Sequence, residues 1–167
     1  MRHGQAAVET VLAVVVLTVL FFWLLQLSQL VTARIMLDHA AARAARARAV
    51  GFNDFMCLKS ARVAMIPVAG RRTWPEEGDF TESSRIPIYL CTDNEALARG
   101  VLEYERWPGM RVSAESGGGV SPEATAEVSL EYPVMLGDLF PGKGGLTVNG
   151  KAAVESHFPF YMNDSGL

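Results

Sequence analysis

The most prominent hydrophobic pattern in the chain is a long run without a charged residue, from Thr10 to Ala33. As an α-helix rising about 1.5 Å per residue, this run spans roughly 36 Å, more than the roughly 30 Å hydrocarbon core of a bilayer. A removable secretory signal usually has a shorter apolar region of about 7–15 residues. A domain of this size could also hardly enclose such a helix on all sides. The pattern therefore predicts a transmembrane helix.

An alanine-rich stretch extends this helix beyond the membrane as far as Val50, and Gly51 is expected to end it. At about 100° per residue, small and apolar side chains form one narrow stripe along the extension. The stripe consists of Ala33, Met36, Leu37, Ala40, Ala44 and Ala47, with Arg43 and Arg46 on one flank and Arg34 and Arg48 on the other. Such a face suits close packing, either against the chain's own sheet or against another subunit.

The remaining pattern predicts short helices followed by strands. One helix is expected from Asn53 or Asp54 to Met65, and a capping-box pattern at residues 92–95 predicts another to about Arg106. Residues 67–85, rich in glycine, proline and charge, are interpreted as a loop. Alternating apolar and polar residues then predict three strands around 110–115, 125–132 and 151–158. The predicted fold class is α+β, with a long N-terminal transmembrane helix extended into a small domain of short helices and an antiparallel β-meander.

Charge is unevenly distributed along the 167 residues, whose formal net charge is −3. Residues 1–49 hold five arginines and two acidic residues, whereas the rest of the chain holds ten basic and sixteen acidic residues. An acidic C-terminal part argues against nucleic-acid binding, which requires clustered cations.

The candidate chemistry outside the helix is sparse. Cys57 and Cys91 are the only cysteines. Outside the cytoplasm they would form a disulfide that closes about 35 residues and stabilises the fold by roughly 4 kcal/mol; the alternative is two buried thiols that lie too far apart. Residues 137–144 nearly match a phosphate-binding loop but lack its final Ser or Thr, so we interpret them as a loop between strands. We expect no catalysis, no metal, no cofactor and no small-molecule substrate.

The residues before the span suggest a processing signal. A basic leader ends at Gly4, and Glu9 follows five residues later at the edge of the apolar run. A carboxylate at membrane depth is costly, which makes Glu9 a candidate functional residue; alternatively, it simply lies among the lipid headgroups. With the long span and the Ala-Arg stretch at residues 39–48, this N-terminus resembles the TadE-like pseudopilins of the tight-adherence (Tad, or Flp) type IV pilus system over residues 2–50.

This resemblance implies that a prepilin peptidase cuts between Gly4 and Gln5, and that Glu9 of one subunit pairs with the new amine of its neighbour. Thr10 stands where Tyr or Phe often follows the glutamate in major Flp pilins, which favours a minor pilin or pseudopilin. The implied partners are the membrane, the peptidase, and other pilins or pilus-assembly proteins.

The expected organisation is a leader at 1–4, a transmembrane helix with its extension at 5–50, and an extracytoplasmic α+β domain at 51–167. The leader motif places the N-terminus in the cytoplasm and the chain in a bacterial inner membrane, although the arginines beyond the span run against the positive-inside tendency. The expected role is assembly of a Tad-type pilus or a related secretion machine. The alternative is a signal-anchored envelope protein with a periplasmic binding domain unrelated to pili.

Overall fold

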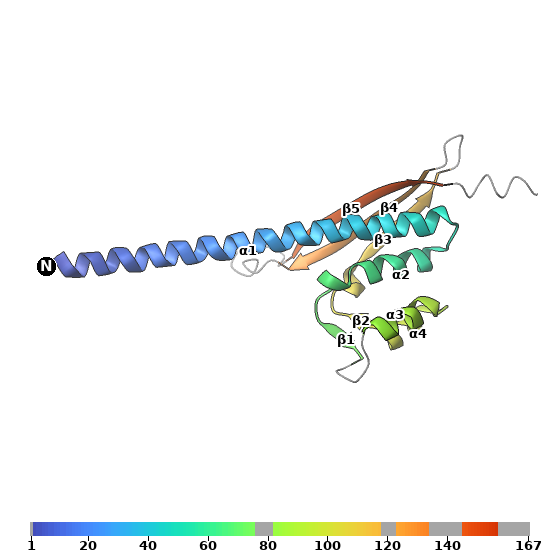
Figure 1. The fold of residues 1–167 in the computed structure, drawn as a ribbon, viewed down its shortest axis with the longest axis horizontal. Helices are drawn as coiled ribbons and strands as arrows, with labels where there is room; N and C mark the ends of the chain where they lie inside the picture. The colour runs from blue at the N-terminus through green and yellow to red at the C-terminus, as the bar shows by residue number, and fades with distance from the viewer. Residues whose placement is uncertain (1, 76–81, 118–122, 134–144, 157–167) are drawn as a thin grey trace, which may run out of the picture.

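One helix dominates the architecture. The computed structural model describes residues 2–75, 82–117, 123–133 and 145–156, and the side chains from residue 7 onward. Helix α1 (Arg2–Ala49) projects from a mixed domain in which α2, a three-stranded sheet and a smaller set of elements gather around its C-terminal part (Figure 1). Its 48 residues correspond to roughly 72 Å. The predicted α+β class is confirmed.

The end of α1 is a glycine cap. Gly51 adopts a left-handed conformation with φ of 93°, which glycine accommodates without the penalty of a Cβ atom. Its N–H donates to the carbonyl of Arg48 at 2.9 Å, and the N–H of Phe52 donates to the carbonyl of Ala47 at 3.1 Å. These two bonds form a Schellman motif. The predicted end of the helix at Gly51 is therefore confirmed.

Helix α2 (Asp54–Ala64) follows immediately and runs beside α1 (Figure 1). The side chain of Asn53 accepts a hydrogen bond from the N–H of Met56 at 2.9 Å, which caps the first turn. The helix ends just before Met65, two residues ahead of Pro67. Both of its predicted boundaries are confirmed.

The predicted meander is also confirmed, but its third strand begins at Gly145, earlier than the predicted start at Lys151. Strands β3 (Arg111–Ser116), β4 (Glu123–Pro133) and β5 (Gly145–Glu155) form an antiparallel sheet in the order β3-β4-β5. Burial alternates strictly along β4, from exposed Glu123 through buried Ala124 to exposed Thr125 and onward. The even-numbered residues of β4 face α1 and α2, and the odd-numbered residues face away from them.

The C-terminal part of α1 lies directly on this sheet. Gly150 of β5 sits so close to α1 that a Cβ atom there would overlap the backbone of Leu37 and Asp38. Farther along, the Oγ of Ser156 donates to the carbonyl of Ala49 at 3.2 Å. Strand β5 and α1 therefore run side by side between these two contacts.

A second group of elements lies on the other side of α2, away from α1 (Figure 1). It contains β1 (Arg72–Trp74), α3 (Glu82–Cys91), α4 (Glu95–Val101), β2 (Glu103–Tyr104) and a 3₁₀ turn η2 (Trp107–Gly109). A 3₁₀ turn η1 (Ile66–Val68) leads from α2 into this group and still contacts α1. Strands β1 and β2 pair antiparallel. A separate hydrophobic cluster, which includes Tyr89, Tyr104 and Trp107, fills its centre.

Two sequence predictions are wrong in this group. The region 67–85 is not simply a loop, because it contains β1 and the start of α3. The second predicted helix does not reach Arg106: Asn94 caps it, and it ends at Val101, where Leu102 becomes extended. Burial of Leu102 and Tyr104 and the pairing of β2 with β1 favour the extended backbone beyond Val101.

Candidate membrane-anchoring and assembly site

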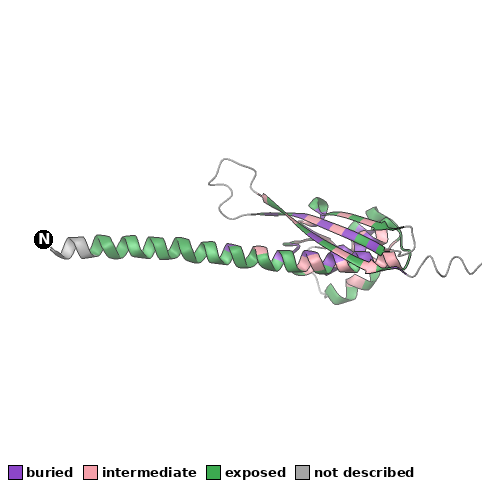
Figure 2. Cartoon of the chain, turned by 90° about the horizontal axis from the view of Figure 1, so that it is seen from above, coloured by how far each residue is buried: buried purple, intermediate pink, exposed green. Residues whose placement is uncertain are grey.

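The N-terminal part of α1, up to Leu25, is exposed along the side chains that the structure describes. Its large apolar side chains from Val8 to Leu25 are 41–65% exposed, and Figure 2 shows most of the helix that projects from the domain as exposed. The helix is long and apolar enough to cross a membrane, and none of its most apolar window is buried within the protein. Exposing so many apolar side chains to water costs free energy, so the hydrocarbon interior of a lipid bilayer is the environment that suits this surface.

The predicted processing residues lie at the start of this helix. Gly4 and Gln5 are in its first turns, and Glu9 follows as an exposed residue at the beginning of the apolar stretch. A helix rise of about 1.5 Å per residue separates Gly4 from Glu9 by roughly 7.5 Å along the axis. Among the described residues Glu9 has no ion-pair partner within 4.0 Å. Its expected pairing with another subunit stays a prediction.

The predicted packing stripe faces the chain's own domain. Ala33, Leu37, Ala40 and Ala44 are fully buried, and Met36 and Ala47 are partly buried. Their contacts are with α2 and with the strands of the sheet. Of the two alternatives left open by the sequence, this structure realises packing on the chain's own sheet.

The buried face is wider than the sequence predicted. Ala41 and Ala45 are also fully buried, with 0% exposure. A second row of small residues is needed because α1 is covered from two directions, by the sheet and by α2. The repeated Ala-Ala pairs at 40–41 and 44–45 were the available signal for this second contact.

The arginines of the extension lie in two different environments. Arg34 pairs with Asp38 at 3.4 Å, and Arg48 pairs with Asp54 at 3.1 Å. Arg43 and Arg46 are exposed on the side of α1 that faces away from the buried stripe. Among the described residues, neither of these two arginines has an ion-pair partner within 4.0 Å.

The predicted disulfide is absent: both cysteines are free, Cys57 buried and Cys91 exposed. Cys57 belongs to the cluster that faces α1, and its thiol lies 3.8 Å from the carbonyl oxygen of Phe52. Lys59, on another side of α2, reaches the end of α3 beside Cys91. The two cysteines therefore lie on different sides of α2, which corrects the prediction. Burial raises the pKa of the Cys57 thiol.

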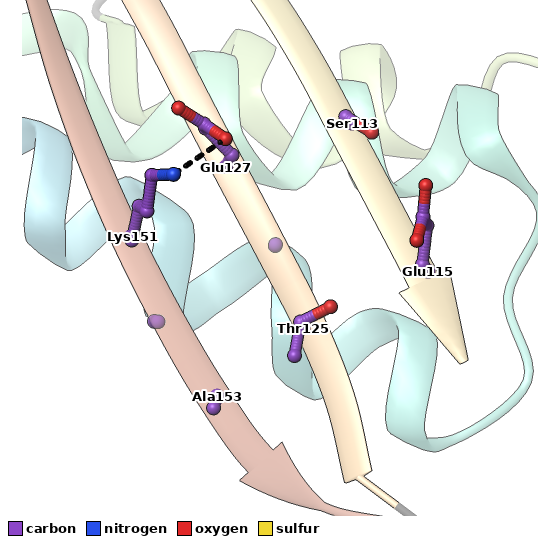
Figure 3. A pocket seen from close by; sticks show the side chains of 8 residues that line it. Ser113, Glu115, Thr125, Glu127, Lys151 and Ala153 are labelled. Carbon is purple, nitrogen blue, oxygen red and sulfur yellow. Dashed lines mark ion pairs between the residues drawn. The ribbon is translucent and has the colours of Figure 1, made fainter. Parts of the chain in front are cut away.

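The sheet presents a polar surface on the side away from α1. A shallow depression of about 460 Å³ is lined by Ser113, Glu115, Thr125, Ala126, Glu127, Lys151, Ala152 and Ala153. Figure 3 shows the Lys151 ammonium directed at Glu127, an ion pair of 3.0 Å, while Glu115 and Thr125 lie farther along the strands. The depression is open and has no converging catalytic groups among the residues that line it.

Within the described part of the chain, no group of three or more His, Cys, Asp or Glu residues is placed to hold a metal ion. The phosphate-loop-like segment at 137–144 lies outside the described residues.

These features define a class: a protein with a single-pass N-terminal membrane anchor whose helix continues into an α+β domain. Residues 4–46 match a family model described as TadE-like protein. The resemblance predicted from the sequence is confirmed over those residues, which include Glu9, the apolar span and most of the packing stripe. No curated protein and no solved structure matches the chain. The TadE-like segment supports the assignment of this chain as a protein associated with a Tad pilus.

Proposed function

We propose that this protein is a minor pilin or pseudopilin that acts in the assembly of a Tad-type pilus or a related secretion machine. The observation that carries the proposal is the TadE-like match over residues 4–46, the part of the chain that includes the leader boundary and the span. The membrane-exposed half of α1 supports a role inside the bilayer, and the domain is available for contacts beyond it.

A prepilin peptidase would cut between Gly4 and Gln5. Glycine suits the residue before the cut because it presents no side chain next to the scissile bond. Cleavage would leave a cationic amine on Gln5, and Glu9 of an adjacent subunit could pair with it. Two opposite charges that enter an apolar region together lower each other's burial cost, whereas either charge alone is expensive.

The N-terminal mass of the protein tests this proposal directly. In a bacterial strain with a prepilin peptidase, we expect the mature chain to begin at Gln5, and in a matched strain without the peptidase to retain the leader. Gly4→Leu should block the cut in the first strain. An uncut N-terminus in the peptidase-positive strain would contradict the pilin proposal and favour a signal-anchored envelope protein.

Glu9 provides a second test, separate from cleavage. Glu9→Ala should leave processing and membrane insertion intact but lower co-purification with other pilus-assembly proteins, because the proposed partner of the Gln5 amine is lost. Glu9→Asp keeps the charge and serves as the control. Equal co-purification of wild type and Glu9→Ala would remove the assembly role of this carboxylate.

The proposed location is a bacterial inner membrane, with the N-terminus in the cytoplasm and the domain outside it. The test uses the Gly4→Leu variant, which should keep its leader and therefore an epitope tag fused to the N-terminus. Protease added to intact spheroplasts should then digest the domain while sparing the tag. Protection of the domain would reverse the proposed topology.

A further inference from the structure

The extension of α1 carries an unpaired cationic surface on its outward side. His39, Arg43 and Arg46 are spaced by four and three residues, so they form one exposed ridge along the helix, here called the arginine ridge. The neighbouring Arg34 and Arg48 are already paired with carboxylates. Within the described part of the chain, the ridge itself faces no acidic partner.

The opposite side of the molecule carries an anionic surface that has no ion-pair partner in the described part of the chain. Glu115, Glu123 and Glu155 are exposed on the side of the sheet away from α1, and are here called the acidic sheet end. Glu123 and Glu155 are direct partners in the β4–β5 register. Like charges opposite each other in a sheet are destabilising. The cation of this sheet face near them, Lys151, is engaged with Glu127 (Figure 3).

The two surfaces lie at the same height along α1. Contacts of Gly150 with Leu37 and of Ser156 with Ala49 align β5 with the helix at two levels. The six steps along the strand from Gly150 to Ser156 rise roughly 20 Å, and the twelve steps along the helix from Leu37 to Ala49 rise roughly 18 Å, so the two elements advance together.

Intermediate positions follow from this alignment. Glu155, and Glu123 paired with it, come at the level of about Arg46 to Arg48. Glu115 pairs with Thr125, which pairs with Ala153, so this row lies at the level of about Arg43.

We propose that a second copy of this chain docks side by side in the same membrane, with the acidic sheet end of one copy against the arginine ridge of the next. A membrane span fixes the depth of each copy, so neighbours in one bilayer meet at equal heights. A sideways displacement alone then brings opposite charges together. Because the contact joins two different surfaces, it is heterologous and extends into a row.

This inference requires the membrane anchor but not cleavage at Gly4, so it goes beyond the proposed function. Its test can fail while the N-terminal mass supports processing, and the reverse is equally possible. Mass analysis of the same membrane samples reports on processing independently.

Cysteine crosslinking in membranes of the expressing cells tests the contact in the full chain. The background is Cys91→Ser, because Cys57 is buried and Cys91 is exposed. Cells co-express one tagged copy with His39→Cys and one differently tagged copy with Thr125→Cys. A short bismaleimide should link the two copies, and neither variant should be linked when it is expressed alone. Linkage of either variant to itself would indicate a symmetric contact and overturn the proposal.

Charge reversal provides a matched set of variants. Arg43→Glu with Arg46→Glu makes both surfaces acidic, and Glu123→Arg with Glu155→Arg makes both basic. Each pair of changes should lower crosslinking at least about tenfold, because like charges across an interface cost several kcal/mol. The chain with all four reversals should recover crosslinking, since its surfaces are complementary again.

Recovery would show that each double reversal weakens the contact itself and does not damage the fold, because the fourfold variant contains all the changes of both double variants. Unchanged crosslinking after either reversal, or no recovery in a fourfold variant whose circular dichroism matches wild type, would overturn the proposal. Crosslinking of the cysteine pair without charge reversals should also fall at high salt, because salt screens exposed charges.

Discussion

The cluster between α1, α2 and the sheet consists mainly of alanine, other aliphatic residues and methionine, whereas the cluster around α3 and α4 is centred on aromatic rings, with a buried arginine beside them. In the first cluster, small residues let backbones approach until Gly150 lies against Leu37. In the second, the rings of Tyr89 and Tyr104 lie 5.2 and 4.8 Å from that of Trp107.

Polar groups are also distributed differently between the two clusters. Arg62 is 3% exposed and lies near the Trp107 ring and Glu95, at 5.9 Å and 3.9 Å respectively. The fully buried Lys59 donates to the carbonyls of Leu90 and Thr92 at 2.7 and 2.5 Å, which places a cation at the C-terminal end of α3. The comparison teaches that close backbone packing holds the first cluster, whereas packed aromatic rings with buried cations beside them hold the second.

The largest expected effect is at Gly150 in the first cluster. Gly150→Ala would push a methyl group into the backbone of α1, which cannot move aside as a side-chain tip can, so we expect destabilisation of about 3 kcal/mol or more. Gly100→Ala is the control: a Cβ atom there meets nothing within 4 Å, and its helical position predicts a gain of roughly 0.5–1 kcal/mol. Thermal unfolding of the full chain in detergent, followed by near-ultraviolet circular dichroism, measures both. Equal behaviour of the two variants would show that α1 is not held against β5.

The next effect is at Lys59 in the second cluster. Lys59→Met keeps the length of the side chain but leaves the carbonyls of Leu90 and Thr92 without their donor, which should cost about 1–3 kcal/mol. Lys151→Met, which removes only an exposed ion pair, is the matched control and should cost at most about 1 kcal/mol. The same unfolding measurement applies. A stable Lys59→Met protein would show that burial of the stem, not the hydrogen bonds, matters at this position.

A smaller effect is expected at Gly51, where α1 turns toward α2. Gly51→Ala would place a Cβ atom on a residue with φ of 93°, at a cost of about 1–2 kcal/mol. Because the cap only ends the helix, the change should lower the Tm without altering helix content at low temperature. Far-ultraviolet circular dichroism distinguishes this outcome from loss of α1 itself.

The smallest effect concerns pH and Glu103 in the second cluster. Burial raises the pKa of Glu103 above its ordinary 4.5; Arg62 and Arg99 oppose the shift, and Glu95 adds to it. The folded protein therefore binds this proton more tightly than the unfolded chain does. Its contribution to stability is complete below the unfolded pKa and is lost as pH rises through the folded pKa.

Glu103→Gln removes this titration. We expect the fall in Tm between about pH 4 and about pH 7 to become smaller in the variant than in the wild type. Glu115→Gln, on the exposed sheet face, is the control and should leave the fall unchanged. An identical pH profile in the wild type and Glu103→Gln would mean that Glu103 is solvated in the folded protein.

The first cluster was largely predictable from the sequence. Its elements have strong local signals: the periodic alanine stripe of α1, the helix cap at Asn53, and the strict alternation along β4. The second cluster was not. The helix predicted to reach Arg106 ends at Val101, and α3 was missed because Pro87 and the charged residues before it indicate a loop. Short segments with weak periodicity take their structure from the neighbours they pack against.

The sequence by itself determined the long apolar helix, its end at Gly51 and the two-residue period of the strands, because these depend on local conformation and on which solvent each face meets. Only the tertiary structure decided that α1 is covered from two directions, that Cys57 and Cys91 lie on different sides of α2, and that the arginine ridge and the acidic sheet end share one height. These properties depend on the relative placement of distant segments, which close packing at Gly150 and the contact of Ser156 with Ala49 fix.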